Sequence, residues 1–209
     1  MIYSSTNSGL VKADIIDLSE CFTPVKREYD RGEIITICSS ENDTIGIILS
    51  GTAYLSTTNT EEQRRILDYY GAGEMFGMHF IPQNENKGFY IVAKTACTVY
   101  LVKYEKFISC CHNHCEKHTK VISNLIMSGV KKHLAHIDVL SQRTLRSKLL
   151  SFFEYLKNER GSNSFILPLP LSDLADYLAV DRSAMMREIK KLNEEEVIKS
   201  ARRKITLLF

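Results

Sequence analysis

Two arginines five positions apart, Arg182 and Arg187, are the residues of this chain whose type and spacing point most directly to a chemistry. A guanidinium group can donate two hydrogen bonds to the edge of a guanine in the major groove of DNA, and the hydroxyl of Ser183 can serve a base or a phosphate. Lys190 adds a further positive charge three positions after Arg187. These side chains predict a surface that binds double-stranded DNA.

Two predicted helices would have to position these side chains. Ser172 is a favourable N-cap for the first helix, which ends at a break over residues 179–181. Asp181 can then cap the second helix. In that helix one stripe is apolar and the opposite face is polar: the stripe holds Ala184, Met185, Ile189 and Leu192, and the outward face holds Arg182, Ser183, Met186, Arg187 and Lys190. An ordinary pair of amphipathic helices with a solvated basic face is the alternative interpretation.

A basic turn follows the second helix. Apolar residues at 197–198 and from Ile205 onward flank the basic residues Arg202, Arg203 and Lys204. This pattern predicts two short strands joined by a turn, because apolar runs bounded by a polar cluster are typical of a hairpin. The turn would be a wing that contacts phosphate through Arg202 and Arg203.

The segment from residue 167 to residue 208, LPLPLSDLADYLAVDRSAMMREIKKLNEEEVIKSARRKITLL, resembles the carboxy-terminal winged helix of the Crp/Fnr transcription regulators. In that family two arginines and an acidic residue between them read bases, and the resemblance assigns the arginine positions to Arg182 and Arg187. Ser183 stands where the members that bind cyclic AMP usually carry glutamate. Because glutamate accepts a hydrogen bond from cytosine N4 and serine need not, this difference changes the DNA sequence that we expect, and not the expectation of DNA binding.

The first hundred residues have a different pattern. Short β-rich segments alternate with glycines and polar clusters, at 33–38, 45–49, 53–56, 65–70, 90–93 and 98–103. Such spacing predicts a closed or double-sheet β architecture. Four segments resemble the cyclic-nucleotide-binding jelly roll of the same family: RGEII (31–35), ILSGTAYLS (48–56), GAGEMFG (71–77) and AKTACTVYLVKYEKF (93–107). The resemblance therefore implies an α+β fold with an amino-terminal β jelly roll, a long dimerisation helix and a carboxy-terminal winged helix-turn-helix.

A long helical pattern without proline covers residues 114–140. Its stripe consists of Ile122, Leu125, Ile126, Gly129, Val130, His133, Leu134, Ile137 and Leu140. Apolar residues at this spacing can form a coiled-coil seam, and in the family this helix pairs with its copy. We therefore expect a homodimer that binds an inverted repeat with half-sites about one helical turn apart, and the resemblance implies RNA polymerase as a further partner. A helix packed on its own domain is the alternative, because Lys131, Lys132, His133 and His136 would weaken a strict zipper.

A second helical pattern at 144–158 has an apolar face that should lie against the winged helix, and Gly161 would end it. We expect the domain boundary near residues 138–141. The predicted domains are an effector-sensing β domain at 1–113, a dimerisation helix at 114–140 and a DNA-binding domain at 141–209.

Composition limits the classes of function. The chain has 209 residues, of which 44% are hydrophobic, and a formal net charge of +2, so it would bind DNA through a local basic surface rather than its overall charge. It has no apolar run of membrane-spanning length, and its amino terminus lacks a charged region followed by a hydrophobic core. We therefore expect no membrane partner and a cytoplasmic location. The six cysteines form no evident disulfide framework and are expected to be thiols.

The β domain would hold an effector pocket, whose candidate residues are Gly77, Met78, His79, Lys87, Lys131 and Lys132. Members of the family that bind cyclic AMP use a glutamate for the ribose hydroxyls and an arginine for the phosphate. At the corresponding positions, Met78 cannot accept a hydrogen bond from a ribose, and Lys87 lacks the planar fork with which arginine holds phosphate. We therefore expect a small-molecule effector other than cyclic AMP.

Two alternatives involve metal-binding side chains. The segment GEMFGMH (73–79) is similar to a segment of the haem-containing, carbon-monoxide-sensing member of the family, in which the histidine at the position of His79 is a haem ligand. A haem-based gas or redox sensor is therefore an alternative function. The cluster at 110–118 places Cys111, Cys115 and His118 at helical spacing for zinc or redox chemistry, but no second ligand pair accompanies it. A thiol or metal enzyme is the least supported interpretation, because no motif combines a nucleophile, a base and an orienting residue, and we expect no enzyme.

Overall fold

The structure is a computed structural model of the chain, and it describes residues 22–37, 43–58, 64–77, 88–109 and 116–209. Residues 131–209 form one compact unit, and the described residues up to 130 form the other.

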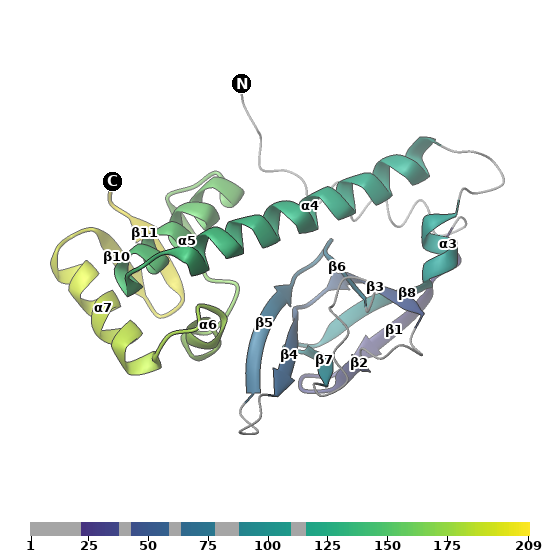
Figure 1. The fold of residues 1–209 in the computed structure, drawn as a ribbon, viewed down its shortest axis with the longest axis horizontal. Helices are drawn as coiled ribbons and strands as arrows, with labels where there is room; N and C mark the ends of the chain where they lie inside the picture. Colours follow the sequence, from purple (N-terminus) through teal and green to yellow (C-terminus); the bar gives the residue numbers. More distant parts are fainter. Residues whose placement is uncertain (1–21, 38–42, 59–63, 78–87, 110–115) are drawn as a thin grey trace. The chain divides into compact units, whose positions relative to one another are not determined.

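The first unit contains two four-stranded antiparallel sheets, with strand orders β1-β8-β3-β6 and β2-β7-β4-β5 (Figure 1). The strands are β1 Val25–Tyr29, β2 Ile34–Ile37, β3 Thr44–Ser50, β4 Ala53–Thr58, β5 Arg64–Tyr70, β6 Met75–Gly77, β7 Phe89–Ala93 and β8 Cys97–Lys103. The predicted double-sheet β architecture is confirmed. Each of the six β-rich segments contains a strand, and β1 and β6 are additional.

Side chains that alternate along the strands form the core of this unit. Ile48, Leu55, Ile91 and Val99 belong to one buried cluster, which also contains the ring of Phe76. Phe76 lies opposite Gly46 in the β3–β6 ladder, and a β-carbon at Gly46 would lie 2.1 Å from Phe76 Cζ. Glycine is therefore required at this position for the ring to fill the core.

Cys97 is buried in this cluster as a free thiol, as the sequence predicted. Its Sγ donates to the carbonyl oxygens of Thr52 at 3.1 Å and Thr95 at 3.2 Å. Burial raises the pKa of the Cys97 thiol, which makes this cysteine unreactive.

A second cluster joins the sheets to helices. Helix α3 spans Tyr104–Ile108, and helix α4 spans Glu116–Ser141, close to the predicted limits of the long helix. Phe107 of α3 and Val121 and Leu125 of α4 are buried together with Phe22.

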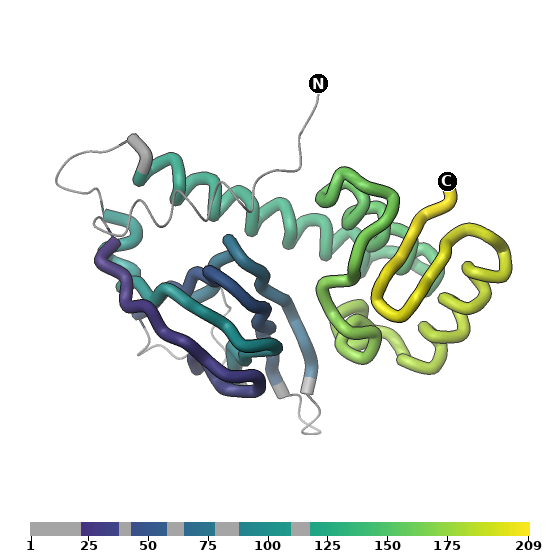
Figure 2. Tube along the Cα trace, turned by 180° about the vertical axis from the view of Figure 1, so that it is seen from behind, coloured from purple at the N-terminus to yellow at the C-terminus, as the bar shows by residue number. Residues whose placement is uncertain are grey.

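The second unit begins within α4 and continues to the carboxy terminus (Figure 2). Its further elements are α5 Leu145–Arg160, β9 Ser164–Ile166, α6 Leu171–Tyr177, α7 Arg182–Glu194, β10 Ile198–Ala201 and β11 Lys204–Leu207. Helix α5 matches the predicted second helix: Thr144 caps it by accepting from Ser147 N, and Gly161 ends it with a φ of 61°. Strand β9 completes a three-stranded sheet in the order β10-β11-β9, and the sequence did not indicate it.

The prediction that Ser172 is an N-cap is wrong. Helix α6 begins at Leu171, and the capping position is Pro170, whose carbonyl accepts from Leu174 N at 2.9 Å. Proline fixes the backbone φ in a range that suits the residue before a helix, so the helix starts two residues earlier than an N-cap at Ser172 would have set it. The Ser172 hydroxyl instead donates to Asp173 Oδ1 at 3.2 Å.

Candidate DNA-binding surface

The second helix of the predicted pair, α7, begins where the sequence indicated. Asp181 has an extended backbone, and its Oδ1 accepts a hydrogen bond from Ala184 N at 2.7 Å. A tight turn precedes it, in which Ala179 adopts a left-handed φ of 51° and Val180 N donates to Ala175 O at 3.0 Å. The two helices are therefore joined as in a helix-turn-helix.

The two faces of α7 divide as predicted except at Ala184, which is half-buried and not buried. Met185, Ile189 and Leu192 are at most 4% exposed and pack inward. The outward residues Arg182, Ser183, Met186, Arg187 and Lys190 are all exposed. The beginning of α7 therefore presents two guanidinium groups and a hydroxyl to solvent, at the end of the helix that enters the major groove in helix-turn-helix proteins.

The predicted wing is formed by β10 and β11. Ala201 pairs with Lys204, which leaves Arg202 and Arg203 as a two-residue turn. Arg202 is exposed and has a φ of 55°. The guanidinium of Arg203 donates to the carbonyl oxygen of Leu167 from Nε at 3.2 Å and from Nη2 at 2.5 Å. Arg203 therefore ties the wing to the segment that precedes α6, a role that the sequence did not indicate.

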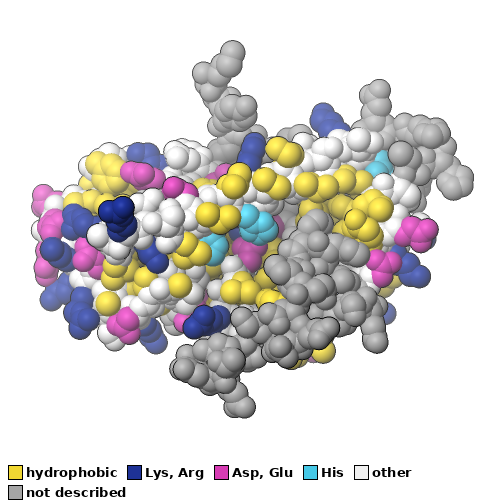
Figure 3. All heavy atoms as spheres, in the orientation of Figure 1, with side chains coloured by type: hydrophobic (Ala, Val, Ile, Leu, Met, Phe, Trp, Pro, Cys, Tyr) yellow, Lys and Arg dark blue, Asp and Glu magenta, His cyan; other side chains and the backbone are white. Residues whose placement is uncertain are grey.

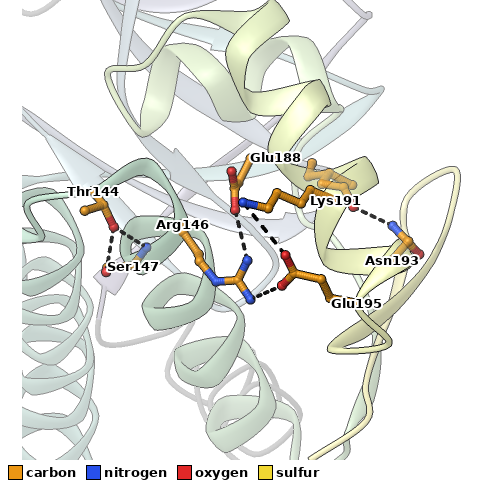
Figure 4. A network of polar contacts seen from close by, with 8 residues as sticks. Thr144, Arg146, Ser147, Glu188, Lys191, Asn193 and Glu195 are labelled. Atoms are coloured by element: carbon orange, nitrogen blue, oxygen red, sulfur yellow. Dashed lines mark hydrogen bonds and ion pairs between the residues drawn. The ribbon is translucent and has the colours of Figure 1, made fainter.

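Arg146 of α5 forms ion pairs with an acidic residue of α7 and with its C-cap residue (Figure 4). Its Nη1 lies 3.4 Å from Glu188 Oε1, and its Nη2 lies 2.5 Å from Glu195 Oε2. Lys191 Nζ also lies 3.8 Å from Glu195 Oε1. The hydrogen bond from Arg146 holds the pKa of Glu195 below its usual value, and the same bond raises the pKa of Arg146. Glu188 and the C-cap residue Glu195 are seven positions apart, which places them on one side of α7, but the sequence analysis did not identify Arg146 as their shared cation.

Asn193, labelled in Figure 4, lies near the end of α7 and also bonds to the wing. Its Nδ2 donates to Ile189 O at 2.7 Å and to Ser200 Oγ at 2.8 Å, and its Oδ1 accepts from Ser200 N at 2.7 Å. The side-chain amide therefore fixes the first strand of the wing relative to the helix. In the sequence this residue belonged to a polar run without an assigned role.

The candidate effector residues fall partly outside the described residues. Gly77 ends β6 and is buried, Lys131 is exposed, and Lys132 is 6% exposed. The other candidates, Met78, His79 and Lys87, lie outside the residues that the structure describes. The haem hypothesis at His79 and the interpretation of the pocket therefore stay predictions.

The candidate metal ligand His118 is packed in the core. It is 3% exposed, its Nε2 lies 3.2 Å from the carbonyl oxygen of Phe107, and its ring meets Phe22 edge to face at 4.7 Å between centroids. Cys111 and Cys115 lie outside the described residues. Among the residues that are described, no group of three His, Cys, Asp or Glu side chains could hold a metal ion.

Comparison with protein families gives two matches in succession. Residues 26–114 match the cyclic nucleotide-binding domain, and residues 147–208 match the Crp-like helix-turn-helix domain. The second match contains α6, α7 and the wing. In the described part of the chain, no helix is both long and apolar enough to cross a membrane.

Related proteins match along most of the chain. The nitrogen fixation regulation protein FixK of Rhizobium meliloti (strain 1021) is 20% identical over 178 residues, which is 85% of this chain and 76% of that protein. A cyclic nucleotide-binding domain containing protein from Listeria monocytogenes EGD-e has a similar fold, with a TM-score of 0.74 and 16% identity over 93% of this chain and 97% of that one. FixK2 from Bradyrhizobium japonicum gives a TM-score of 0.68 and 16% identity over 89% of this chain and 93% of that one.

Proposed function

Because this chain belongs to the Crp/Fnr family of transcription regulators, we propose that it acts as a homodimer that binds an inverted-repeat DNA operator through α7 and the wing. Its relatives are regulators of transcription and not enzymes. The observation that carries the proposal is the exposed basic face at the start of α7.

That face has the charge and the geometry for base reading. Arg182 and Arg187 are exposed and lie within the first two turns of α7, whose opposite stripe is buried. An exposed arginine that serves no packing function is available for bidentate contact with guanine O6 and N7. Lys190, Arg202 and Arg203 extend the positive charge toward phosphates on either side. Ser172 and Ser183 add hydroxyls to the proposed interface.

Exposed apolar side chains on α4 support the homodimer. Figure 3 shows hydrophobic side chains gathered over the middle of this helix. Five residues at helical spacing are between 38% and 62% exposed: Ile126, Met127, Val130, Leu134 and Ile137. A contiguous apolar row of this length is unfavourable in water, and pairing with the same row of a second copy would bury it. A two-fold dimer would then present its α7 helices to successive major grooves.

The proposed effector of the β domain is a small molecule other than cyclic AMP. Support comes from the sequence, in which Met78 and Lys87 replace the glutamate and the arginine of the cyclic AMP-binding members. A buried nucleotide without these partners would leave polar groups unsatisfied. The family resemblance suggests RNA polymerase as a further partner. We propose three parts for the chain: residues 1–113 as the sensing domain, residues 114–140 as the dimerisation helix and residues 141–209 as the DNA-binding domain.

Selection from random double-stranded DNA with the full chain tests this proposal. We expect an inverted repeat to be enriched, and Arg187→Ala to reduce the ratio of operator to random-DNA affinity by about ten-fold or more, since one bidentate contact contributes roughly 1 to 3 kcal/mol. Lys120→Ala, which removes an exposed lysine of α4, is the matched control and should keep the parent's ratio. Failure to enrich any sequence, or a selective Arg187→Ala variant, would contradict the proposal.

A further inference from the structure

A methionine lies exposed among the basic residues of α7. Met186 is 41% exposed, whereas its neighbour Met185 is fully buried. The other apolar residues at the centre of this helix, Ile189 and Leu192, are also buried. An exposed methionine is unexpected in a helix whose other large apolar residues near the centre are buried. A polar residue at this position would serve solubility and packing equally well.

The position of Met186 gives a reason for its exposure. Successive turns of a helix bring residues three and four positions apart together on one face, so Met186 lies beside Ser183 and Arg182 and directly before Arg187. These are the residues to which the proposed function assigns base contact. We infer that Met186 contacts the C5-methyl group of a thymine in the operator half-site. This inference rests on the proposed function.

The chemistry of base edges selects thymine. In the major groove the base edges present hydrogen-bond donors and acceptors, and among them thymine alone adds a methyl group, where cytosine has only the smaller C5–H. The thioether of Met186 offers no N–H or O–H donor, so contact with a polar edge would remove water from that edge without replacing its hydrogen bond. Contact with the thymine methyl group buries two apolar surfaces against each other. The flexible methionine side chain can adapt its position to reach it.

This assignment restricts the operator. Arg182 lies one turn before Met186 and Arg187 directly follows it, and all three are exposed, so the thymine should lie within the same half-site as the guanines that the arginines read. Loss of the methyl group from this thymine would then weaken binding even though every hydrogen-bonding atom of the base pair is kept.

Replacement of thymine by deoxyuridine tests the inference, because it removes the methyl group and keeps every hydrogen-bonding atom. The operator is first obtained by selection with the full chain, and each symmetry-related pair of thymines is then replaced in turn. We expect that replacement of one of these pairs weakens binding of the parent protein by about four-fold for each half-site, because a single buried methyl group contributes about this much. Met186→Gln, whose side chain has a similar length but a polar end, should bind the operator with thymine and the operator with deoxyuridine equally.

Two further variants separate base reading from folding. Met186→Leu should keep the dependence on the methyl group, and Lys190→Ala, on the same exposed face, should keep it as well. All variants should unfold at the parent's urea concentration, since the replaced side chains are exposed. An operator without a methyl-dependent thymine, or equal methyl dependence in the parent and Met186→Gln, would overturn the inference and leave DNA recognition by α7 intact. If selection enriches no sequence at all, the proposed function fails first and this assignment fails with it.

Discussion

The imidazole of His136 in α4 lies face to face with the ring of Tyr177 in α6, with 3.8 Å between the ring centroids and 8° between the planes. His136 Nε2 also lies 3.0 Å from the carbonyl oxygen of Tyr177, which accepts a hydrogen bond from the ring N–H. Lys148 of α5 donates to the next carbonyl, that of Leu178, at 3.3 Å. Carbonyls at the end of a helix lack helical partners, so side chains from two other helices complete the end of α6.

Replacement of His136 by alanine should loosen α6. The variant loses both the stacking and the hydrogen bond, and we expect the free energy of unfolding to fall by about 1 to 2 kcal/mol. His136→Gln keeps a donor at the position of Nε2 and should recover part of this loss. Urea denaturation followed by circular dichroism gives the free energies, and hydrogen exchange should be faster in α6. Unchanged exchange in α6 of His136→Ala would show that the contact does not support this helix.

Acid should remove the contribution of the ion pair between Arg146 and Glu195. The pKa of Glu195 is lowered from its ordinary value of 4.5 because Arg146 donates a hydrogen bond to the carboxylate. A lowered pKa means that the folded state favours the ionised form, so the contribution is complete above the ordinary pKa and is lost as pH falls through the lowered pKa. The difference in stability between the parent and Glu195→Gln should therefore be present at neutral pH and vanish in strong acid. Glu194→Gln, whose carboxylate forms an ion pair with the exposed Lys190 at 3.6 Å, should differ less from the parent at neutral pH. A pH-independent difference for Glu195→Gln would count against this account.

The two arginines of the wing should behave differently. Arg202→Ala should lower affinity for all DNA sequences alike and reduce the slope of log affinity against log salt by about 1.8 for the proposed dimer, because it removes one phosphate contact from each of the two wings. Arg203→Ala should also lower the free energy of unfolding by about 1 kcal/mol, because the two hydrogen bonds to Leu167 O are lost. Fluorescence anisotropy over a salt series and urea denaturation measure the two effects. Equal stability of the two variants would show that the Arg203 contact contributes nothing to the fold.

A charge in the apolar row of α4 should separate the proposed dimer. Leu134 is 61% exposed and Ile137 is 62% exposed, so Leu134→Glu should leave the fold unchanged and yield monomers in sedimentation experiments. Ser128 is exposed on the opposite side of the same helix, and Ser128→Glu is the matched control. A dimer that survives Leu134→Glu but is lost in the control would place the interface on another face of α4.

Local periodicity predicted the elements that carry the candidate site. The division of α7 into a buried stripe and an exposed basic face follows from the helical repeat alone, and Asp181 as its cap follows from residue type. Contacts between distant segments could not be predicted in this way. Strand β9 has only three residues and exists because β11 pairs with it, and the bond between Arg203 and Leu167 joins residues that only the folded chain brings together. The error at Ser172 has a different cause, since Pro170 set the start of α6 from its backbone alone.

The left-handed backbone of Arg202 lowers the stability of the wing at the same residue that we propose to contact DNA. Glycine adopts this conformation freely, whereas a residue with a side chain is destabilised in it by roughly 1 kcal/mol. The turn of the wing thus retains a strained arginine at the position where glycine would give the more stable hairpin. Glycine at this position would therefore give a more stable wing but would remove the positive charge from its tip, and with that charge the contribution to DNA affinity that we propose for Arg202.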